Sequence, residues 1–182
     1  MDRVPLTRQA HEALLPHLQP GGLAVDATAG NGHDTLFLAR ALGPHGRVHA
    51  FDVQAEALEN THRRLQAAGV ERRVVLHLSG HERLLEKLPS EGCACAVLFN
   101  LGYLPGGDKR LTTHAETTLT ALEQALRALA PDGLLSVLAY RGHPGGRAEA
   151  EAVAGFLKAR RDLALEVRSS PGPVLFLARR AR

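Results

Sequence analysis

The sequence predicts an α/β protein with a doubly wound, seven-stranded and mostly parallel sheet that ends in a C-terminal antiparallel hairpin. The apolar run 23–26 leads through a turn with Gly30 and Gly32 into a helical stretch, as in a strand–turn–helix unit. The next strand-like run ends in Asp52, 20 residues after Gly32. Strands and helices then alternate until the turn 169–173 separates two last strands. Together these three observations indicate a Rossmann-like sheet with helices on both faces.

Apolar periodicity and turn residues set the bounds of each element. Leucines at helical spacing predict a first helix, which Pro16 weakens near its end. Gly43 ends the second helix, Gly69 the third, and the turn 131–133 the long helix before the fifth strand. The expected helices are 6–18, 34–42, 54–68, a short one around 84–88, 113–129 and 148–161. The expected strands are 23–26, 47–52, 74–78, 95–99, 134–140, 163–167 and 174–178.

Length and composition predict one globular domain over residues 1–182. The hydrophobic content of 45% is ordinary, and no apolar run approaches the roughly 20 residues of a membrane span. Because no apolar core follows the first residues, we expect no signal peptide, a cytoplasmic location and no membrane partner. Cys93 and Cys95 are the only cysteines, and two thiols without a second pair make no zinc site, so no metal is expected.

The basic residues permit an RNA partner without demonstrating one. The formal net charge is +3, and of 22 basic residues only Lys87, Lys109 and Lys158 are lysine. Arginine presents a planar fork that suits phosphate and stacks on bases. A GC-rich genome, which favours arginine codons, explains the same bias equally well. Both interpretations stay open, as does assembly into a homodimer.

Three acids around the glycine turn favour S-adenosylmethionine as the cofactor. Asp26 closes the first strand, Asp34 stands in the first helical turn, and Asp52 is placed to take ribose hydroxyls. A pyrophosphate needs a helix N-terminus without carboxylates, and Thr35 replaces the third glycine of the dinucleotide motif. S-adenosylmethionine instead carries an ammonium and a sulfonium. A dinucleotide and an empty turn kept for folding remain the weaker alternatives.

The segment after the fourth strand has the residues for chemistry on an amine. Asn100 at the expected strand tip can accept hydrogen bonds from an amine, and Tyr103 can stack on a flat base. Asn100-Leu101-Gly102-Tyr103 resembles the Asn-Pro-Pro-Tyr loop of amino-directed methyltransferases, with Leu101-Gly102 in place of two prolines. Asp108 is a candidate proton acceptor, and Lys109 is a candidate substrate contact. The alternatives are a turn cap for Asn100, a half-buried aromatic for Tyr103 and solvated charges for the last two.

Two further turns lie on the same rim of the predicted sheet. His81 and Glu82 follow the third strand, where this fold covers adenine, and a packing role for His81 is favoured over a base. His143, in the turn after the fifth strand, is a candidate proton acceptor or a turn histidine braced by Pro144. The arginines nearest in sequence to the pocket are expected to contact RNA phosphates: Arg110, Arg141 and Arg147.

With these residues assembled, the chain resembles the family of putative rRNA methylases, small class I S-adenosylmethionine-dependent methyltransferases associated with methylating the 5-aminomethyl group of the tRNA wobble uridine. The resemblance covers about residues 10–160. It rests on three segments, which read Val25-Asp26-Ala27-Thr28-Ala29-Gly30-Asn31-Gly32-His33-Asp34-Thr35, Phe99-Asn100-Leu101-Gly102-Tyr103-Leu104-Pro105-Gly106-Gly107-Asp108-Lys109 and Tyr140-Arg141-Gly142-His143-Pro144-Gly145-Gly146.

The resemblance implies a cofactor site and a substrate pocket on named residues. Implied cofactor contacts are Asp26, Thr28, Gly30, Asn31, Gly32, His33, Asp34, Asp52, Gln54, His81 and Glu82. The implied substrate pocket runs from Asn100 through Leu101 and Gly102 to Lys109, and reaches His143. The chain departs from the family before the last strand, where an Asn and paired prolines are expected and the segment 169–173 stands instead.

The leading hypothesis is therefore an RNA methyltransferase acting on the aminomethyl nitrogen of a tRNA wobble uridine. Another substrate, ribosomal RNA or a small amine, is the first alternative. A cofactor-binding partner subunit without catalysis is the second, and a dinucleotide oxidoreductase is the third and weakest.

Overall fold

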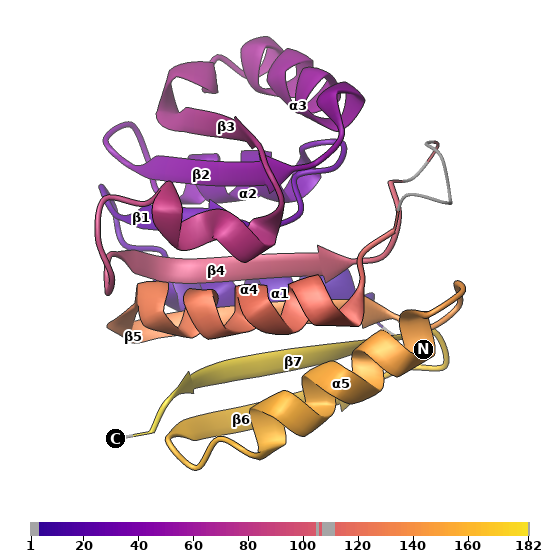
Figure 1. The fold of residues 1–182 in the computed structure, drawn as a ribbon. Helices are drawn as coiled ribbons and strands as arrows, with labels where there is room; N and C mark the ends of the chain where they lie inside the picture. The colour runs from indigo at the N-terminus through magenta and orange to yellow at the C-terminus, as the bar shows by residue number, and fades with distance from the viewer. Residues whose placement is uncertain (1–3, 105, 107–111, 182) are drawn as a thin grey trace.

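The strands form a seven-stranded sheet in the order β3-β2-β1-β4-β5-β7-β6. The computed structural model describes residues 4–104, 106 and 112–181. Strands β1 to β5 pair in parallel, and β7 is antiparallel to both β5 and β6 (Figure 1). Their bounds are β1 Leu23–Asp26, β2 Arg47–Asp52, β3 Val74–Leu78, β4 Ala94–Leu101, β5 Leu129–Tyr140, β6 Leu163–Ser169 and β7 Pro173–Arg180. The predicted fold class is confirmed, including the C-terminal hairpin.

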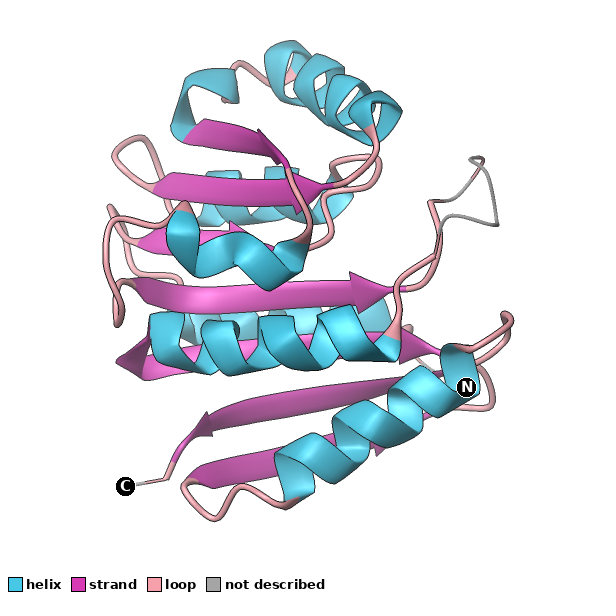
Figure 2. Ribbon diagram, viewed as in Figure 1, coloured by secondary structure: helices cyan, strands magenta, loops and turns pink. Residues whose placement is uncertain are grey.

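Helices cover both faces of this sheet (Figure 2). One apolar cluster joins a face of the sheet to α1, α2 and α3 through Leu14, Leu38 and Leu65. The other cluster joins the opposite face to α4, α5 and a 3₁₀ helix. Each face is buried because the parallel strands are apolar on both sides. The helices are α1 Leu6–Leu14, α2 His33–Ala41, α3 Ala55–Ala67, α4 Ala115–Ala128, α5 Gly146–Lys158 and the 3₁₀ helix His81–Glu86.

Several element bounds differ from the sequence prediction, and three of the differences concern α1, the 3₁₀ helix and β5. Helix α1 ends at Leu14, and a 3₁₀ turn containing Pro16 follows, because proline cannot continue the α-helical hydrogen bonds. The short helix after β3 is 3₁₀ and begins earlier, at His81. Strand β5 begins at Leu129 rather than 134, since the turn residues 131–133 form a bulge against β4 and do not separate helix from strand.

Strand β4 extends further than predicted, and this changes the position of a candidate site residue. The prediction ended it at residue 99 and put Asn100 at the strand tip, whereas the strand continues to Leu101. Asn100 and Leu101 remain paired with Leu138 and Ala139 of β5. Asn100 therefore sits on a rigid strand end beside β1. None of the helices in the described ranges combines the length and apolar character that a membrane crossing requires.

Candidate cofactor and substrate site

The carboxylate of Asp26 lies at the centre of the site, fully buried at the end of β1. It accepts hydrogen bonds from the Thr28 amide (3.1 Å) and from the Thr35 hydroxyl (2.6 Å). Burial, and after it the charges of Asp34 and Asp52, raises the pKa of Asp26 to about 7. Three acids thus share one region, and a bound cation would relieve their repulsion.

Asp52 at the end of β2 is oriented by two backbone amides. Its oxygens accept hydrogen bonds from Gly30 N (3.0 Å) and Gln54 N (2.9 Å). Gly30 has a φ of 52° and Gly32 one of 77°, so the turn uses a left-handed conformation that favours glycine. A Cβ on Gly32 would lie 2.8 Å from the Thr61 Cα, which shows how closely the turn packs on α3. Gln54 contacts Asp52 through its backbone amide and not through its side chain.

Asp34 in the first turn of α2 connects three elements. Its Oδ1 accepts a hydrogen bond from His11 Nε2 of α1 (2.6 Å), and its Oδ2 accepts one from the Asn100 amide of β4 (3.3 Å). The His11 ring stacks on Phe37, with centroids 3.9 Å apart and planes at 3°. Sequence reasoning missed His11, because its partner is 23 residues away on another helix.

These groups fit S-adenosylmethionine better than a dinucleotide. Asp26 and Asp34 would face an ammonium or a sulfonium favourably, whereas a pyrophosphate would meet their charges at the start of α2. Asp52 is held with both oxygens at the strand end, which suits a pair of ribose hydroxyls. The absent Cβ of Gly30 lets a ligand approach the backbone.

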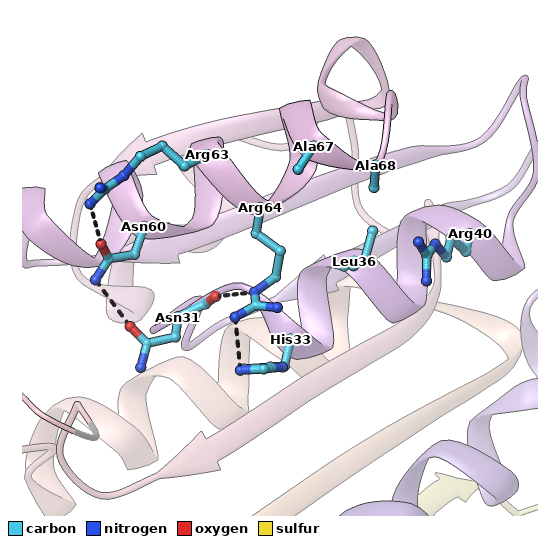
Figure 3. A pocket seen from close by; sticks show the side chains of 9 residues that line it. All are labelled: Asn31, His33, Leu36, Arg40, Asn60, Arg63, Arg64, Ala67 and Ala68. Carbon is cyan, nitrogen blue, oxygen red and sulfur yellow. Dashed lines mark hydrogen bonds between the residues drawn. The ribbon is translucent and has the colours of Figure 1, made fainter.

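His81, for which the sequence favoured a packing or adenine-edge role over a base, is buried after β3. It is 8% exposed, its Nδ1 lies 3.2 Å from the Ala27 carbonyl oxygen, and its ring is tilted against Phe99 at 5.5 Å. Burial lowers the pKa of His81, so the ring is neutral and donates to Ala27. The carboxylate of Glu82 folds back over Gly80, where a Cβ would be 2.2 Å from it. Two other predicted cofactor residues, Asn31 and His33, line a groove between α2 and α3 (Figure 3).

Asn100 joins the end of β4 to the glycine turn and the start of α2. Its backbone N donates to Thr28 Oγ1 (2.7 Å), while its side-chain NH₂ donates to Asp34 (3.3 Å). The donor end of the amide is thereby used, and the oxygen is the end that can accept a hydrogen bond from an amine. The side chain of Leu101 is fully buried in the core, so only its backbone can face a substrate.

Hydrogen bonds join residues 102–103 to residues 112–113, the two sides of the predicted substrate loop. Tyr103 forms a bridge with Thr112, and the Gly102 carbonyl accepts hydrogen bonds from Thr113 N (3.0 Å) and Thr112 Oγ1 (3.0 Å). The Tyr103 ring is 39% exposed. Three predicted site residues, Asp108, Lys109 and Arg110, lie outside the described residues.

His143 faces Tyr103 across this loop. The two rings meet edge to face at 6.0 Å and 89°. The Nδ1 atom of His143 lies 3.0 Å from the Pro144 carbonyl oxygen and 3.3 Å from Thr112 Oγ1. Because a carbonyl only accepts, Nδ1 carries the proton in the neutral ring and Nε2 has the lone pair. Nε2 is buried and has no hydrogen-bond partner within the described part of the chain.

The two described arginines of the predicted RNA contacts lie in different settings. Arg141 donates from Nε to the Gly172 carbonyl (2.8 Å) and also to the Ser170 carbonyl, so it braces the turn between β6 and β7. This occupies the guanidinium that we predicted to bind phosphate. Arg147 is exposed in the first turn of α5.

Tyr140 at the end of β5 is a candidate site residue that sequence reasoning did not single out. It is 38% exposed and lines a cavity of about 570 Å³ between the start of α1 and the β6–β7 turn. Burial, and then the charge of Asp34, raises the pKa of Tyr140. Its position as the last residue of a strand was the available signal, because ligands bind at the carboxyl ends of parallel strands.

The sheet order, the acids at the ends of β1 and β2, and the glycine turn between β1 and α2 define the class I S-adenosylmethionine-dependent methyltransferase fold. Within that class the chain belongs to the family described as "Putative rRNA methylase", which matches residues 48–169. A chloroplastic tRNA (mnm(5)s(2)U34)-methyltransferase from Arabidopsis thaliana is 41% identical over 162 residues. That match covers 85% of this chain, and the chain spans 59% of the length of that relative.

Solved structures agree with this family over the whole chain. A putative rRNA-methylase from Clostridium thermocellum has a TM-score of 0.94 and 34% identity, and all of both chains is covered. A putative methyltransferase from Streptococcus mutans in complex with SAH has a TM-score of 0.86 and 31% identity, again over all of both chains. An O-methyltransferase from Streptomyces achromogenes in complex with SAM, 17% identical with a TM-score of 0.76, shares the fold over all of this chain and 82% of its own.

Proposed function

We propose that this protein is an S-adenosylmethionine-dependent methyltransferase that methylates the aminomethyl nitrogen on the wobble uridine of tRNA. The observation that carries the proposal is the position of Asn100. Its backbone is bonded to Thr28 and its side-chain NH₂ to Asp34, so its amide oxygen is presented at the boundary between cofactor turn and substrate loop. The name of the Arabidopsis relative supports a wobble uridine as substrate.

The residues present can orient an amine for this reaction. A bound S-adenosylmethionine would supply an electrophilic methyl group, with the methyl–sulfur bond breaking as the bond to the amine nitrogen forms. The Asn100 oxygen accepts one N–H of the amine and thereby directs the lone pair. An alkylamine is protonated near neutral pH, in the range of lysine at about 10.4, so a proton must leave before transfer. His143, whose ring meets Tyr103 edge to face beside the predicted substrate pocket, is the described side chain to which we assign this proton.

The cavity beside Tyr140 is the place for the nucleobase. It opens between α1 and the β6–β7 turn, and Tyr140 at the end of β5 lines it. Strand β5 pairs with β4, and Asn100 lies near the end of β4. Exposed aromatic rings of Tyr103 and Tyr140 offer stacking surfaces for an unpaired base. An anticodon base is unpaired in free tRNA and can be inserted without melting a duplex.

Ribosomal RNA is the second candidate substrate, and the family description favours it. The experiment is single-turnover methylation with radiolabelled S-adenosylmethionine on three substrates. These are tRNA from a strain lacking this methyl group, unmodified rRNA, and a small alkylamine. Nucleoside mass spectrometry should find a methylated aminomethyluridine in the tRNA digest. Label in rRNA or in the amine alone would replace the tRNA assignment, and binding of S-adenosylhomocysteine without transfer to any substrate would indicate a non-catalytic subunit.

The location of the activity is a separate part of the proposal. We propose a cytoplasmic enzyme that acts on cytoplasmic tRNA, in line with the location expected from the sequence. The Arabidopsis relative is named as chloroplastic, so the chemistry itself is not tied to one compartment. Immunoblotting of cell fractions for the untagged protein tests this, and recovery with membranes or an organelle fraction would contradict it.

A further inference from the structure

A groove between α2 and α3 shares Asn31 and His33 with the predicted cofactor turn, and the rest of its lining was not assigned above. It has a volume of about 570 Å³ and is lined by the guanidinium groups of Arg40, Arg63 and Arg64, the imidazole of His33 and the amides of Asn31 and Asn60. Figure 3 shows Asn31, His33 and Arg64 gathered at one end, with Arg40 toward the other. The groove therefore starts at the glycine turn and follows the two helices away from it.

The charge of this groove is of one sign. None of the nine residues that line it is acidic, all nine being described, and three of them are arginines. Arg63 donates to the Asn60 side-chain oxygen (2.6 Å), which is a neutral partner. Guanidinium groups that share a groove without a carboxylate repel one another, and a bound anion removes that repulsion.

The arginine nearest the turn is held in a fixed orientation. Arg64 Nε donates to the Asn31 carbonyl oxygen (2.7 Å), and its Nη2 lies 3.1 Å from His33 Nε2. Its plane is therefore set before any ligand arrives, which lowers the entropic cost of binding. Ala67 and Ala68 line the same groove on the α3 side, and such small side chains let a bulky polyanion approach the helix.

We propose that this groove binds consecutive backbone phosphates of the RNA substrate. The proposal rests on the proposed function and extends it, because it assigns the RNA a second contact surface. Asn31 belongs to the turn whose Gly30 amide bonds to Asp52, so a strand in the groove passes beside the cofactor turn. Phosphodiesters fit the groove because fork-shaped arginines bind phosphate oxygens in pairs, and three arginines line this groove.

The test uses the full chain and a 17-nucleotide anticodon stem-loop RNA, with binding measured by fluorescence anisotropy from 50 to 300 mM KCl. The double variant Arg40→Ala/Arg63→Ala leaves Arg64 and its hydrogen bonds in place. Each lost phosphate contact lowers the slope of log K against log salt by about 0.7–0.9, so the double variant should lose about 1.4–1.8 and bind at least about tenfold more weakly near 100 mM. Arg40→Lys/Arg63→Lys should keep most of the slope.

A matched control removes the same charge elsewhere. Arg161 and Arg179 are both exposed, and they lie at the opposite edge of the sheet, where β7 ends, so Arg161→Ala/Arg179→Ala should change the slope by less than half as much. Equal effects of the two double variants, or no change in the groove variant, would overturn the proposal. Titration with inorganic phosphate distinguishes a site for free phosphate from a site for RNA. Phosphate binding that the groove variant loses, with the salt slope of RNA binding unchanged in that variant, would also overturn the proposal. Failure of the wild type to bind RNA at all would instead refute the proposed function.

Discussion

The Nε2 atom of His11 lies 2.6 Å from Oδ1 of Asp34, which joins helix α1 to the first turn of α2. The other oxygen of Asp34 accepts a hydrogen bond from the Asn100 side chain at 3.3 Å. The first helix is thereby connected, through one carboxylate, to the residue that we propose orients the amine. Stacking of the His11 ring on Phe37 holds this contact in place.

His11→Ala should slow methylation by roughly tenfold, since a hydrogen bond to a charged group contributes about 1.5–3 kcal/mol and its loss frees Asp34 and Asn100. Single-turnover rates on tRNA measure this. His11→Gln, which keeps a donor, should recover part of the rate. The control is Arg8→Ala on the same helix, where Arg8 pairs with Glu12 at the surface. If His11→Ala, like the control Arg8→Ala, retains the wild-type methylation rate, then His11 contributes to packing and does not position Asp34 for the reaction.

Asp52→Ala should weaken the binding of S-adenosylhomocysteine at least about tenfold, because charge-assisted hydrogen bonds to the ribose hydroxyls are lost. Part of the loss would come from the turn, as Gly30 N also bonds to this carboxylate. Isothermal titration calorimetry gives the affinity, and thermal unfolding shows whether the fold is kept. Asp162→Ala removes an exposed carboxylate as the control. An unchanged affinity in Asp52→Ala would contradict the assignment.

Asn100→Ala should lower the methylation rate by roughly 10²-fold through lost positioning, with cofactor affinity changed only slightly. Rapid-quench measurements from pH 6 to 9 should show the wild-type rate rising with pH until the amine or its proton acceptor is deprotonated. Asn100→Asp, similar in size but with no NH₂ to donate to Asp34, should also be impaired. Near-normal rates in Asn100→Ala would mean that this strand end is structural.

Asp26 should make the protein less stable as the pH rises. Its pKa is about 7 in the folded protein against 3.8 in the unfolded chain, so between these values only the unfolded state releases the proton. The free energy of unfolding should fall by about 1.4 kcal/mol per pH unit in this window and level off above pH 7. Urea unfolding from pH 5 to 8 should show this slope relative to Asp26→Asn, which cannot ionise. Parallel curves for the two proteins would contradict the raised pKa.

Much of the fold followed from local pattern. The glycines at 30 and 32, the acids at the ends of the first two strands and the alternation of strands and helices are properties of short segments, and each set a local backbone preference. Bounds were wrong where pairing overrode that preference. Asn100 stays in β4 because it remains paired with Leu138 of β5, and residues 131–133 bulge within β5 because the strand continues beside β4.

The sequence by itself determined the doubly wound sheet and the glycine turn with Asp26 and Asp52 at the ends of the first two strands, and it predicted Asn100 as a candidate site residue. Only the tertiary structure decided what these groups touch: His11 on Asp34, Arg141 on the β6–β7 turn, Tyr140 beside a cavity, and three arginines along one groove. Such contacts join residues from 23 to more than 30 positions apart. Local propensity extends over a few residues, whereas these contacts depend on how helices and strands pack after the sheet has formed.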